Sequence, residues 1–394
     1  MTSEWRTIRA ADFIDFNPRL SLKKGDIATK VAMDKLKPFT KKIPETEKAE
    51  FNGGAKFCNG DTVMARITPC LENGKTAYVD MLDDGEIGFG STEFIVMRAK
   101  TGISDPQFVY YTAINPVFRN VAIKSMVGSS GRQRVQQSVL EELELSVPDL
   151  DEQRRIGDFL ARIDEKIALN DRINDNLEQQ AQSYFQELFV DNADPEWAIG
   201  TISDLGTVVG GSTPSKAKPE YYTESGIAWI TPKDLSINKS KFISHGENDI
   251  TELGLKNSSA AIMPEGTVLF SSRAPIGYIA IAAGEVTTNQ GFKSVVPKPE
   301  IGTPFVYFFL KNTLPVIEGM ASGSTFKEVS GSTMKNVPAV IPDAEILAKF
   351  SDFCAPIFAQ QRTLEEQNQS LAKLRDSLLP KLMSGEIDVS AVHL

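Results

Sequence analysis

Two long stretches of the chain, residues 151–189 and 345–383, share one pattern of apolar and polar positions. Apolar residues and a few amides recur at steps of four and three, with charged residues elsewhere. Such a stripe runs along one face of an α-helix and predicts a coiled coil. The same register recurs 194 positions later. The predicted helix-pair interface consists of Ile156, Leu160, Ile163, Ile167, Asn174, Leu177, Leu188, Phe350, Ile357, Leu364, Asn368, Leu371, Leu378 and Leu382.

The alternative is two ordinary amphipathic helices, each lying on its own globular core. Core helices average about 11–12 residues and have a wider apolar face. Each stretch here continues for about 38 residues, which corresponds to ~57 Å of helix. Polar residues such as Asn174 and Asn368 within the stripe reduce stability but can fix the register and the partner.

The segments that precede the two stretches also resemble one another. Gly60-Asp-Thr-Val-Met-Ala-Arg corresponds to Gly266-Thr-Val-Leu-Phe-Ser-Ser-Arg, and Phe108-Val-Tyr-Tyr corresponds to Phe305-Val-Tyr-Phe. Alternation predicts strands in the first pair of segments, and helical spacing runs from Phe108 to Val121. The lysine-rich stretch from Arg19 to Lys42 is expected to be mostly loop. So long a repeat indicates a duplicated domain and not a stacked array of small units.

The predicted fold is α+β, in the order globule, long helix, globule, long helix. Residues 1–150 and 191–343 are the expected globular domains. Residues 151–190 form the first long helix, and residues 344–394 form the second one with a C-terminal tail. If the helices pair, connectivity favours an antiparallel arrangement, with the two domains related by a pseudo-two-fold axis as an internal repeat.

Composition limits the class of protein. The 394 residues are 41% hydrophobic and 24% charged, which is ordinary for a globular protein of two or three domains. Three cysteines and two histidines at unrelated positions form no recognised disulfide or metal pattern, so we expect neither a metal nor a cofactor. The first residues lack the apolar core of a signal peptide and no run is long enough to span a membrane, which predicts a cytoplasmic location.

Charge is segregated by segment. The net charge of −10 argues against a protein that wraps nucleic acid with its whole surface. However, no acid occurs between Pro106 and Leu140, a segment that contains Arg119, Lys124, Arg132 and Arg134. Local basic regions of this kind favour contact with a polyanion at particular sites.

The chain resembles the specificity (S) subunit of type I restriction–modification systems, and the most specific segments of this resemblance lie in the second half. They are Gly210-Gly-Ser-Thr-Pro-Ser-Lys, residues 221–235, Asn289-Gln-Gly-Phe-Lys, residues 323–330, and Leu378-Leu-Pro-Lys-Leu-Met-Ser-Gly-Glu-Ile. The resemblance covers essentially the whole length. The first half departs from it, because Phe16-Asn-Pro-Arg replaces the Gly-Gly-Thr-Pro type of loop and Val31-Ala-Met-Asp-Lys-Leu only loosely echoes the strand before Asp234.

The resemblance implies a non-catalytic reader of double-stranded DNA. The two globular domains would be target-recognition domains that each read half of a bipartite site, and the helices would set the spacer. Two methyltransferase (M) subunits would dock on the helices, and motor–nuclease (R) subunits would join the complex. A bipartite site suits two readers held at a fixed separation.

The candidate DNA contacts are small, amide and basic residues in loops and at strand ends. Arginine suits guanine and asparagine suits adenine, whereas glycine-rich loops let backbone amides approach phosphates. The alternatives are mobile loops, ordinary turns, a turn capped by Asn289, and solvated or ion-paired arginines. The predicted residues are Arg66, Lys124, Ser129, Ser130, Arg132, Arg134, Ser212, Thr213, Ser215, Lys216, Lys218, Lys233, Arg273, Asn289, Gln290, Lys293, Ser324, Thr325 and Lys327.

Three short motifs point formally to catalysis but lack the necessary context. Pro148-Asp149 with Asp164-Glu165-Lys166 matches a nuclease pattern whose carboxylates should lie on strands and not on a long helix. Asn115-Pro-Val-Phe approaches an adenine-methyltransferase motif without a glycine-rich cofactor loop, and Gly74-Lys-Thr lacks the leading glycine of a P-loop. The remaining alternatives are a coiled-coil scaffold without a nucleic-acid role and a methyltransferase with its own catalytic site.

Overall fold

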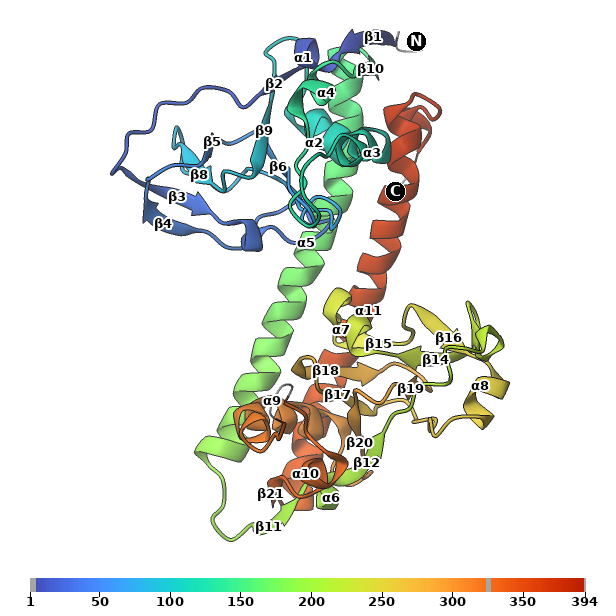
Figure 1. The fold of residues 1–394 in the computed structure, drawn as a ribbon. Coiled ribbons are helices and arrows are strands. Elements are labelled where there is room, and N and C mark those ends of the chain that lie inside the picture. The colour runs from blue at the N-terminus through green and yellow to red at the C-terminus, as the bar shows by residue number, and fades with distance from the viewer. Residues whose placement is uncertain (1–4, 324–326, 393–394) are drawn as a thin grey trace. The chain divides into compact units, whose positions relative to one another are not determined.

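The computed structural model describes residues 5–323 and 327–392, with only the backbone of Ala391. The chain divides into two compact units (Figure 1). Unit 1 comprises Met1–Leu169 and Asn368–Leu394, and unit 2 comprises Asn170–Gln367. This division assigns part of each long helix to each unit, whereas the sequence suggested domains bounded at the ends of those helices.

The two long helices are present. Helix α5 spans Leu150–Gln186, 37 residues, and helix α11 spans Ala344–Met383, 40 residues. Asp151 and Glu152 lie in the first turn of α5, where carboxylates interact favourably with the helix dipole. Helix α11 continues through Pro356 and Pro380.

Within unit 1, α5 and α11 run antiparallel. The Arg375 guanidinium donates to the Asp164 carboxylate at 2.6 Å, and the Asn368 amide donates to the Ile167 carbonyl at 3.4 Å. The tyrosine Tyr111 of the globular part also donates to Asp164, at 2.6 Å. The buried carboxylate therefore joins both helices to the globular part of the unit.

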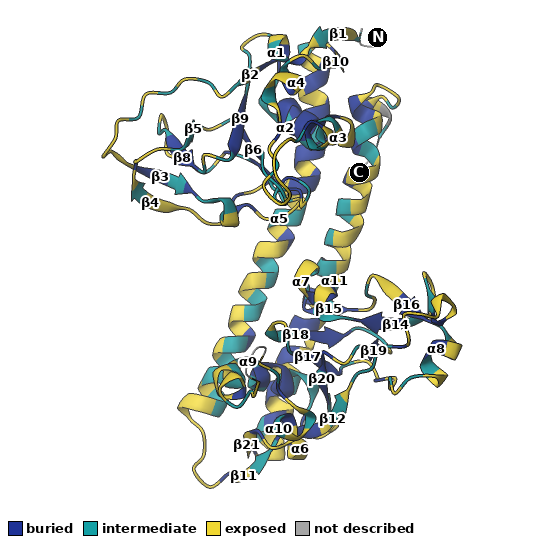
Figure 2. Ribbon diagram, viewed as in Figure 1, coloured by how far each residue is buried: buried dark blue, intermediate teal, exposed yellow. Residues whose placement is uncertain are grey.

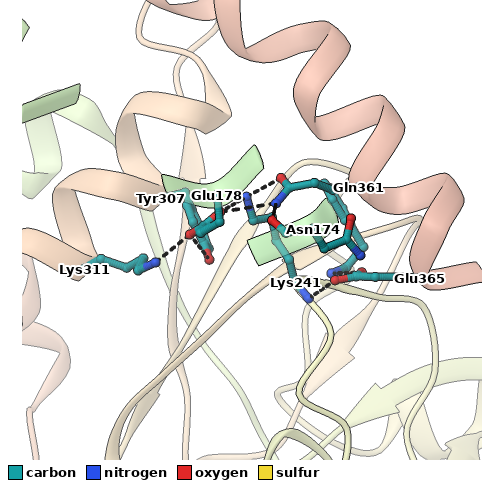
Figure 3. A network of polar contacts seen from close by, with 8 residues as sticks. Asn174, Glu178, Lys241, Tyr307, Lys311, Gln361 and Glu365 are labelled. Carbon is teal, nitrogen blue, oxygen red and sulfur yellow. Dashed lines mark hydrogen bonds and ion pairs between the residues drawn. The ribbon is translucent and has the colours of Figure 1, made fainter. Parts of the chain in front are cut away.

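Within unit 2, the same two helices are again antiparallel. The Asn170 amide donates to Gln367 at 3.4 Å, and the Gln361 amide donates to the Asn174 carbonyl at 3.2 Å. Figure 3 shows a polar network in which Lys311, Lys241 and Tyr307 of the globular part converge on Glu178 of α5. A carboxylate of α5 again ties the helix pair to its globular part.

The globular part of unit 1 contains two four-stranded sheets with short helices. One sheet has the strand order β2-β9-β6-β7 and the other has the order β4-β3-β8-β5, while β1 pairs with β10. The strands are β1 (Arg6–Arg9), β2 (Ile14–Phe16), β3 (Ile27–Val31), β4 (Glu47–Glu50), β5 (Ala55–Phe57), β6 (Thr62–Ala65), β7 (Thr76–Tyr78), β8 (Gly88–Gly90), β9 (Phe94–Ala99) and β10 (Glu144–Val147). The helices are α1 (Ala10–Phe13), α2 (Pro106–Ile114), α3 (Pro116–Lys124) and α4 (Gln137–Glu141).

Unit 2 repeats this plan. Its sheets have the orders β12-β20-β17-β18-β15 and β13-β16-β14-β19, and β11 pairs with β21. The strands are β11 (Ala198–Thr201), β12 (Gly206–Gly210), β13 (Tyr222–Thr223), β14 (Ile227–Ile230), β15 (Phe242–Ile243), β16 (Asn248–Ile250), β17 (Val268–Ser272), β18 (Ile276–Ala282), β19 (Thr287–Thr288), β20 (Lys293–Pro297) and β21 (Pro338–Ile341). The helices are α6 (Ile202–Leu205), α7 (Pro232–Ile237), α8 (Glu252–Lys256), α9 (Thr303–Gly319) and α10 (Gly331–Lys335).

Pairing patterns identify the equivalent strands of the two units. Strand β3 pairs antiparallel with β4 and parallel with β8, and β14 pairs antiparallel with β16 and parallel with β19. The weak sequence echo at Val31 therefore marks a real structural equivalence. The internal duplication predicted from the sequence is confirmed.

Two details of the first segment differ from the sequence prediction. Strand β3 interrupts the expected loop between Arg19 and Lys42, since Ala28 and Val31 of this strand are buried. The expected helix from Phe108 is two helices, because Asn115 ends α2 and its side chain accepts a hydrogen bond from the Val117 amide to cap α3. The Asn-Pro-Val-Phe motif is thus a helix N-cap.

Each globular core includes residues of both long helices (Figure 2). In unit 1, Ile156 and Leu160 pack with Leu382 and with strands β6 and β9. In unit 2, Phe350 and Ile357 pack with Phe305 of α9. Of the other predicted interface residues, Ile163 and Leu364 are buried, whereas Ile167, Asn174, Leu177, Leu188, Asn368, Leu371 and Leu378 are half-buried.

Candidate nucleic-acid interface

In the loop that follows β12 in unit 2, the backbone is fixed by hydrogen bonds from side chains elsewhere in the unit. The Trp229 indole donates to the Ser212 carbonyl at 3.0 Å, and the Tyr222 hydroxyl donates to the Pro214 carbonyl at 2.6 Å. A Cβ added at Gly211 would lie 2.0 Å from the carbonyl oxygen of Asn289, so only glycine allows this approach. The loop therefore has a defined conformation, and it exposes Ser215, Lys216 and Lys218 to solvent.

Amide side chains lie beside this loop. The Thr213 hydroxyl donates to the Gln290 carboxamide, and the Asn289 carboxamide oxygen accepts from the Gly291 amide at 2.8 Å. Asn289 therefore caps a turn, as one of the sequence alternatives stated. Gln290 remains exposed next to the loop.

The strand-end arginine of unit 2 is joined to a carboxylate. Glu328 lies 3.4 Å from the Arg273 guanidinium and 3.8 Å from the Lys293 ammonium. Burial lowers the pKa of Lys293, and the charge of Glu328 opposes that shift. Since Lys293 also donates to the Gln290 carbonyl at 3.3 Å, the structure brings Thr213, Gln290, Lys293 and Arg273 into one cluster.

In unit 1 the corresponding region contains Arg66 directly after β6. Its backbone amide donates to the Glu93 carbonyl at 2.9 Å. The Glu93 carboxylate accepts from Arg134 at 2.7 Å, and the side-chain hydrogen bonds from Arg134 lower the pKa of Glu93. Arg134 is the last residue of the glycine-containing loop at residues 128–134, so this ion pair fixes one end of the loop beside Arg66.

A cavity of about 550 Å³ adjoins Arg66 in unit 1. Sequence reasoning missed most of its polar lining, namely Asn17, Arg19, Lys56 and Thr92. The signal available in the sequence was the loop Phe16-Asn-Pro-Arg, which takes the place of the Gly210 loop of unit 2. Its basic residue was counted only as part of a lysine-rich stretch.

The remaining predicted contacts are more scattered. Lys124, Ser129, Ser130, Arg132 and Lys327 are exposed, and Lys233 forms an exposed ion pair with Glu247 at 2.6 Å. Ser324 and Thr325 lie outside the described residues. All of these positions stay predictions.

Metal ligation and membrane insertion concern residues 5–323 and 327–392, the part of the chain that the structure describes. No three His, Cys, Asp or Glu side chains there converge on a position where a metal ion could bind. In the same part of the chain, every helix is too short or too polar to traverse a bilayer.

The model of the type I restriction modification DNA specificity domain matches this chain twice, at residues 3–179 and 195–372. The chain therefore belongs to the family of type I restriction–modification DNA specificity proteins. The resemblance drawn from the motifs is confirmed.

Individual relatives agree with this assignment. The chain is 38% identical over 195 residues to the MjaIX specificity subunit of Methanocaldococcus jannaschii, an alignment that covers 49% of this chain and only 45% of that protein. It is 25% identical to the HindI specificity subunit of Haemophilus influenzae, with 83% of this chain and 86% of that protein covered. These relatives are named as specificity subunits, which agrees with the predicted class and not with a scaffold or a catalytic methyltransferase.

A solved structure shows the same fold. The type I restriction–modification system S subunit from M. genitalium superposes with a TM-score of 0.55 at 18% identity and covers 96% of both chains. Two family domains with mixed helix and strand content are thus established for this chain.

Proposed function

We propose that this chain is the DNA sequence-specificity subunit of a type I restriction–modification complex. The single observation that carries the proposal is the repeated cluster. In each unit, a basic residue at the end of the equivalent strand β6 or β17 lies beside a turn and a loop rich in polar residues. Domains at residues 1–150 and 191–343 each read one half of a bipartite DNA target through such a cluster.

The long helices set the spacer between the half-sites. We propose that α5 and α11 form an antiparallel coiled coil, with the domains at its two ends related by a pseudo-two-fold axis. The antiparallel contacts within each unit support this arrangement. Two methyltransferase subunits dock on the helices, and motor–nuclease subunits join the assembly in the cytoplasm.

The negative net charge of the chain implies that the partner subunits contribute to binding of the DNA phosphates. A net charge of −10 weakens attraction to DNA phosphates, so the isolated chain binds DNA modestly and the partner subunits supply much of the positive surface. Binding by the complete complex falls with salt because phosphate contacts release counterions. Base-edge contacts from both domains select the sequence, and bending of the duplex would help the methyltransferase to flip out its target adenine.

The decisive experiment is methylome mapping in cells with and without the gene. We expect one bipartite adenine-methylation motif to disappear on deletion and to return with the wild-type gene. Unchanged methylation in the deletion strain would refute the proposal, provided that the partner genes are expressed.

Two further measurements separate the alternatives. A methyltransferase with its own site would bind S-adenosylmethionine in calorimetry of the isolated chain, and we expect no binding. A scaffold without a nucleic-acid role would tolerate simultaneous Arg132→Ala, Arg134→Ala and Lys327→Ala changes, whereas we expect reduced methylation by the complex.

A further inference from the structure

The cavity of unit 1 is lined by three cations and no carboxylate. Arg19 follows β2, Lys56 lies in β5 and Arg66 follows β6, so residues far apart in the sequence meet there. Leu20, Phe94 and Val96 supply an apolar part of the wall. A cationic site for a small inorganic anion needs no such wall, whereas a nucleotide offers both a phosphate and a base.

The cationic side chains of the cavity differ in how far they are exposed to solvent. Arg19 is exposed, whereas the Arg66 side chain is half-buried and its Nε is buried. Among the residues that the structure describes, nothing accepts a hydrogen bond from this Nε. A buried donor without an acceptor costs about 1–3 kcal/mol. A ligand in the cavity can reach only the exposed part of this half-buried side chain, which lines the cavity wall.

Glu93 interacts with the charge of Arg66 but forms its hydrogen bonds with Arg134; its pKa is lowered first by Arg134 and also by the charge of Arg66. Both oxygens of Glu93 accept hydrogen bonds from Arg134, at 2.7 to 3.0 Å. The Lys56 ammonium donates to the Leu20 carbonyl at 3.0 Å and lies 5.0 Å from the centre of the Phe51 ring. These contacts hold the lysine in place and leave its charge uncompensated within this cavity.

We propose that the first recognition domain contacts one base pair of its DNA half-site at this cavity. Arg66 donates to the acceptor edge of one base in the major groove, as arginine does to guanine O6 and N7. Arg19 and Lys56 hold the phosphates on either side of that base pair. This inference rests on the proposed function and assigns roles within it to Arg19 and Lys56, residues that the sequence did not single out.

The test uses the full chain assembled with its methyltransferase subunits. Dissociation constants are measured for the target duplex and for a duplex of unrelated sequence, each at several salt concentrations. Arg66→Ala should weaken target binding about tenfold or more and leave unrelated DNA nearly unaffected. Arg19→Ala and Lys56→Ala should weaken both duplexes by the same factor and reduce the salt slope by about one.

Two control variants separate a specific loss of DNA affinity from a general effect of removing a positive charge. Lys24→Ala removes an exposed positive charge of the same unit that does not line the cavity, and it should change neither affinity nor specificity. Arg66→Lys keeps the charge but not the bidentate geometry, so it should lose discrimination while binding unrelated DNA normally. In cells, Arg66→Ala should relax one position of one half-site in the methylation motif.

The outcomes are distinguishable. Equal losses on both duplexes for Arg66→Ala would make it a phosphate contact and overturn the base-reading role. Unchanged target binding by all three cavity variants would overturn the site, even if the wild-type complex recognises a bipartite motif. A wild-type complex without any sequence preference would instead refute the proposed function itself.

Discussion

The two units build the same topology but treat their cations differently. In unit 2, Lys241 pairs with Glu178 and Arg273 pairs with Glu328. In unit 1, the equivalent Lys41 and Arg66 form no ion pair with any described carboxylate. Equivalence is clear for the lysines, since the carbonyl of each accepts a backbone hydrogen bond from the matching strand, from Tyr78 in β7 and from Ile281 in β18.

The difference shows that one fold supports two electrostatic designs. In unit 2, Glu328 pairs with Arg273, so DNA bound at the proposed site would compete with Glu328 for this arginine. Arg66 of unit 1 forms no ion pair with a described carboxylate, although the charge of Glu93 acts on it from farther away, so DNA bound at the proposed site would displace no carboxylate from it. The buried lysines show the same contrast. Lys41 contacts Gln107, Tyr111 and aromatic rings, and Asp164 acts on it only at longer range. Lys241 forms a direct ion pair with Glu178.

The largest expected effect comes from removing the carboxylate of unit 2. Glu178→Ala leaves Lys241 and Lys311 without their shared partner, and breaking such a buried pair costs about 3–5 kcal/mol. Urea denaturation followed by circular dichroism measures the loss. Gln179→Ala, an exposed neighbour on α5, should change stability by much less. If Glu178→Ala and Gln179→Ala reduced stability equally, the ion pairs of Glu178 would not be what stabilises unit 2.

The second prediction concerns Lys41 and pH. Burial lowers the pKa of Lys41 to about 8 from its usual 10.5. Below pH 8 both the folded and the unfolded chain carry this proton, so the cost of the buried charge is fully present. Between about pH 8 and pH 10.5 only the unfolded chain keeps the proton, and stability rises with pH.

Lys41→Met should therefore unfold at higher urea concentration than the wild type at pH 7. The advantage should shrink by up to about 3 kcal/mol as the pH rises through that window. Lys241→Met should have the opposite sign at pH 7, because it leaves Glu178 with Lys311 alone. A stability difference for Lys41→Met that does not change with pH would contradict the assigned cause.

The smallest expected effect is on DNA affinity in unit 2. Glu328→Gln frees Arg273 and Lys293 from an ion pair whose partners are partly exposed, and such pairs contribute about 0–1 kcal/mol. We expect binding of target DNA by the complex to tighten by a few-fold, as read by fluorescence anisotropy. Glu318→Gln, which removes an exposed charge of α9, serves as the control. Weaker binding of the Glu328 variant would mean that the carboxylate positions Arg273 for DNA and does not compete with it.

The sequence predicted the features that depend on local pattern. The repeated stripe located α5 and α11, and alternation located β6 and β17 together with the arginines that follow them. These signals are strong because each lies within one continuous element.

The features that depend on distant segments were missed. Arg19 and Lys56 meet Arg66 only because β2 and β5 belong to sheets that approach each other in unit 1. Lys41 and Lys241 were missed for another reason, since lysine is rarely buried and no pattern distinguishes a buried one. The spacing of residues along the chain does not reveal which distant residues come into contact in the fold.

The close approach of Gly211 to Asn289 means that Gly211 cannot be replaced without moving the loop, whereas the exposed side chains of the loop can be replaced. Main-chain contacts define the path of the loop, and they do not depend on which side chains the loop presents. Residues such as Ser215 and Lys216 can therefore be exchanged without remodelling the scaffold. If this loop contacts DNA as proposed, single substitutions in it would alter the target, while the glycine that shapes the loop stays the same.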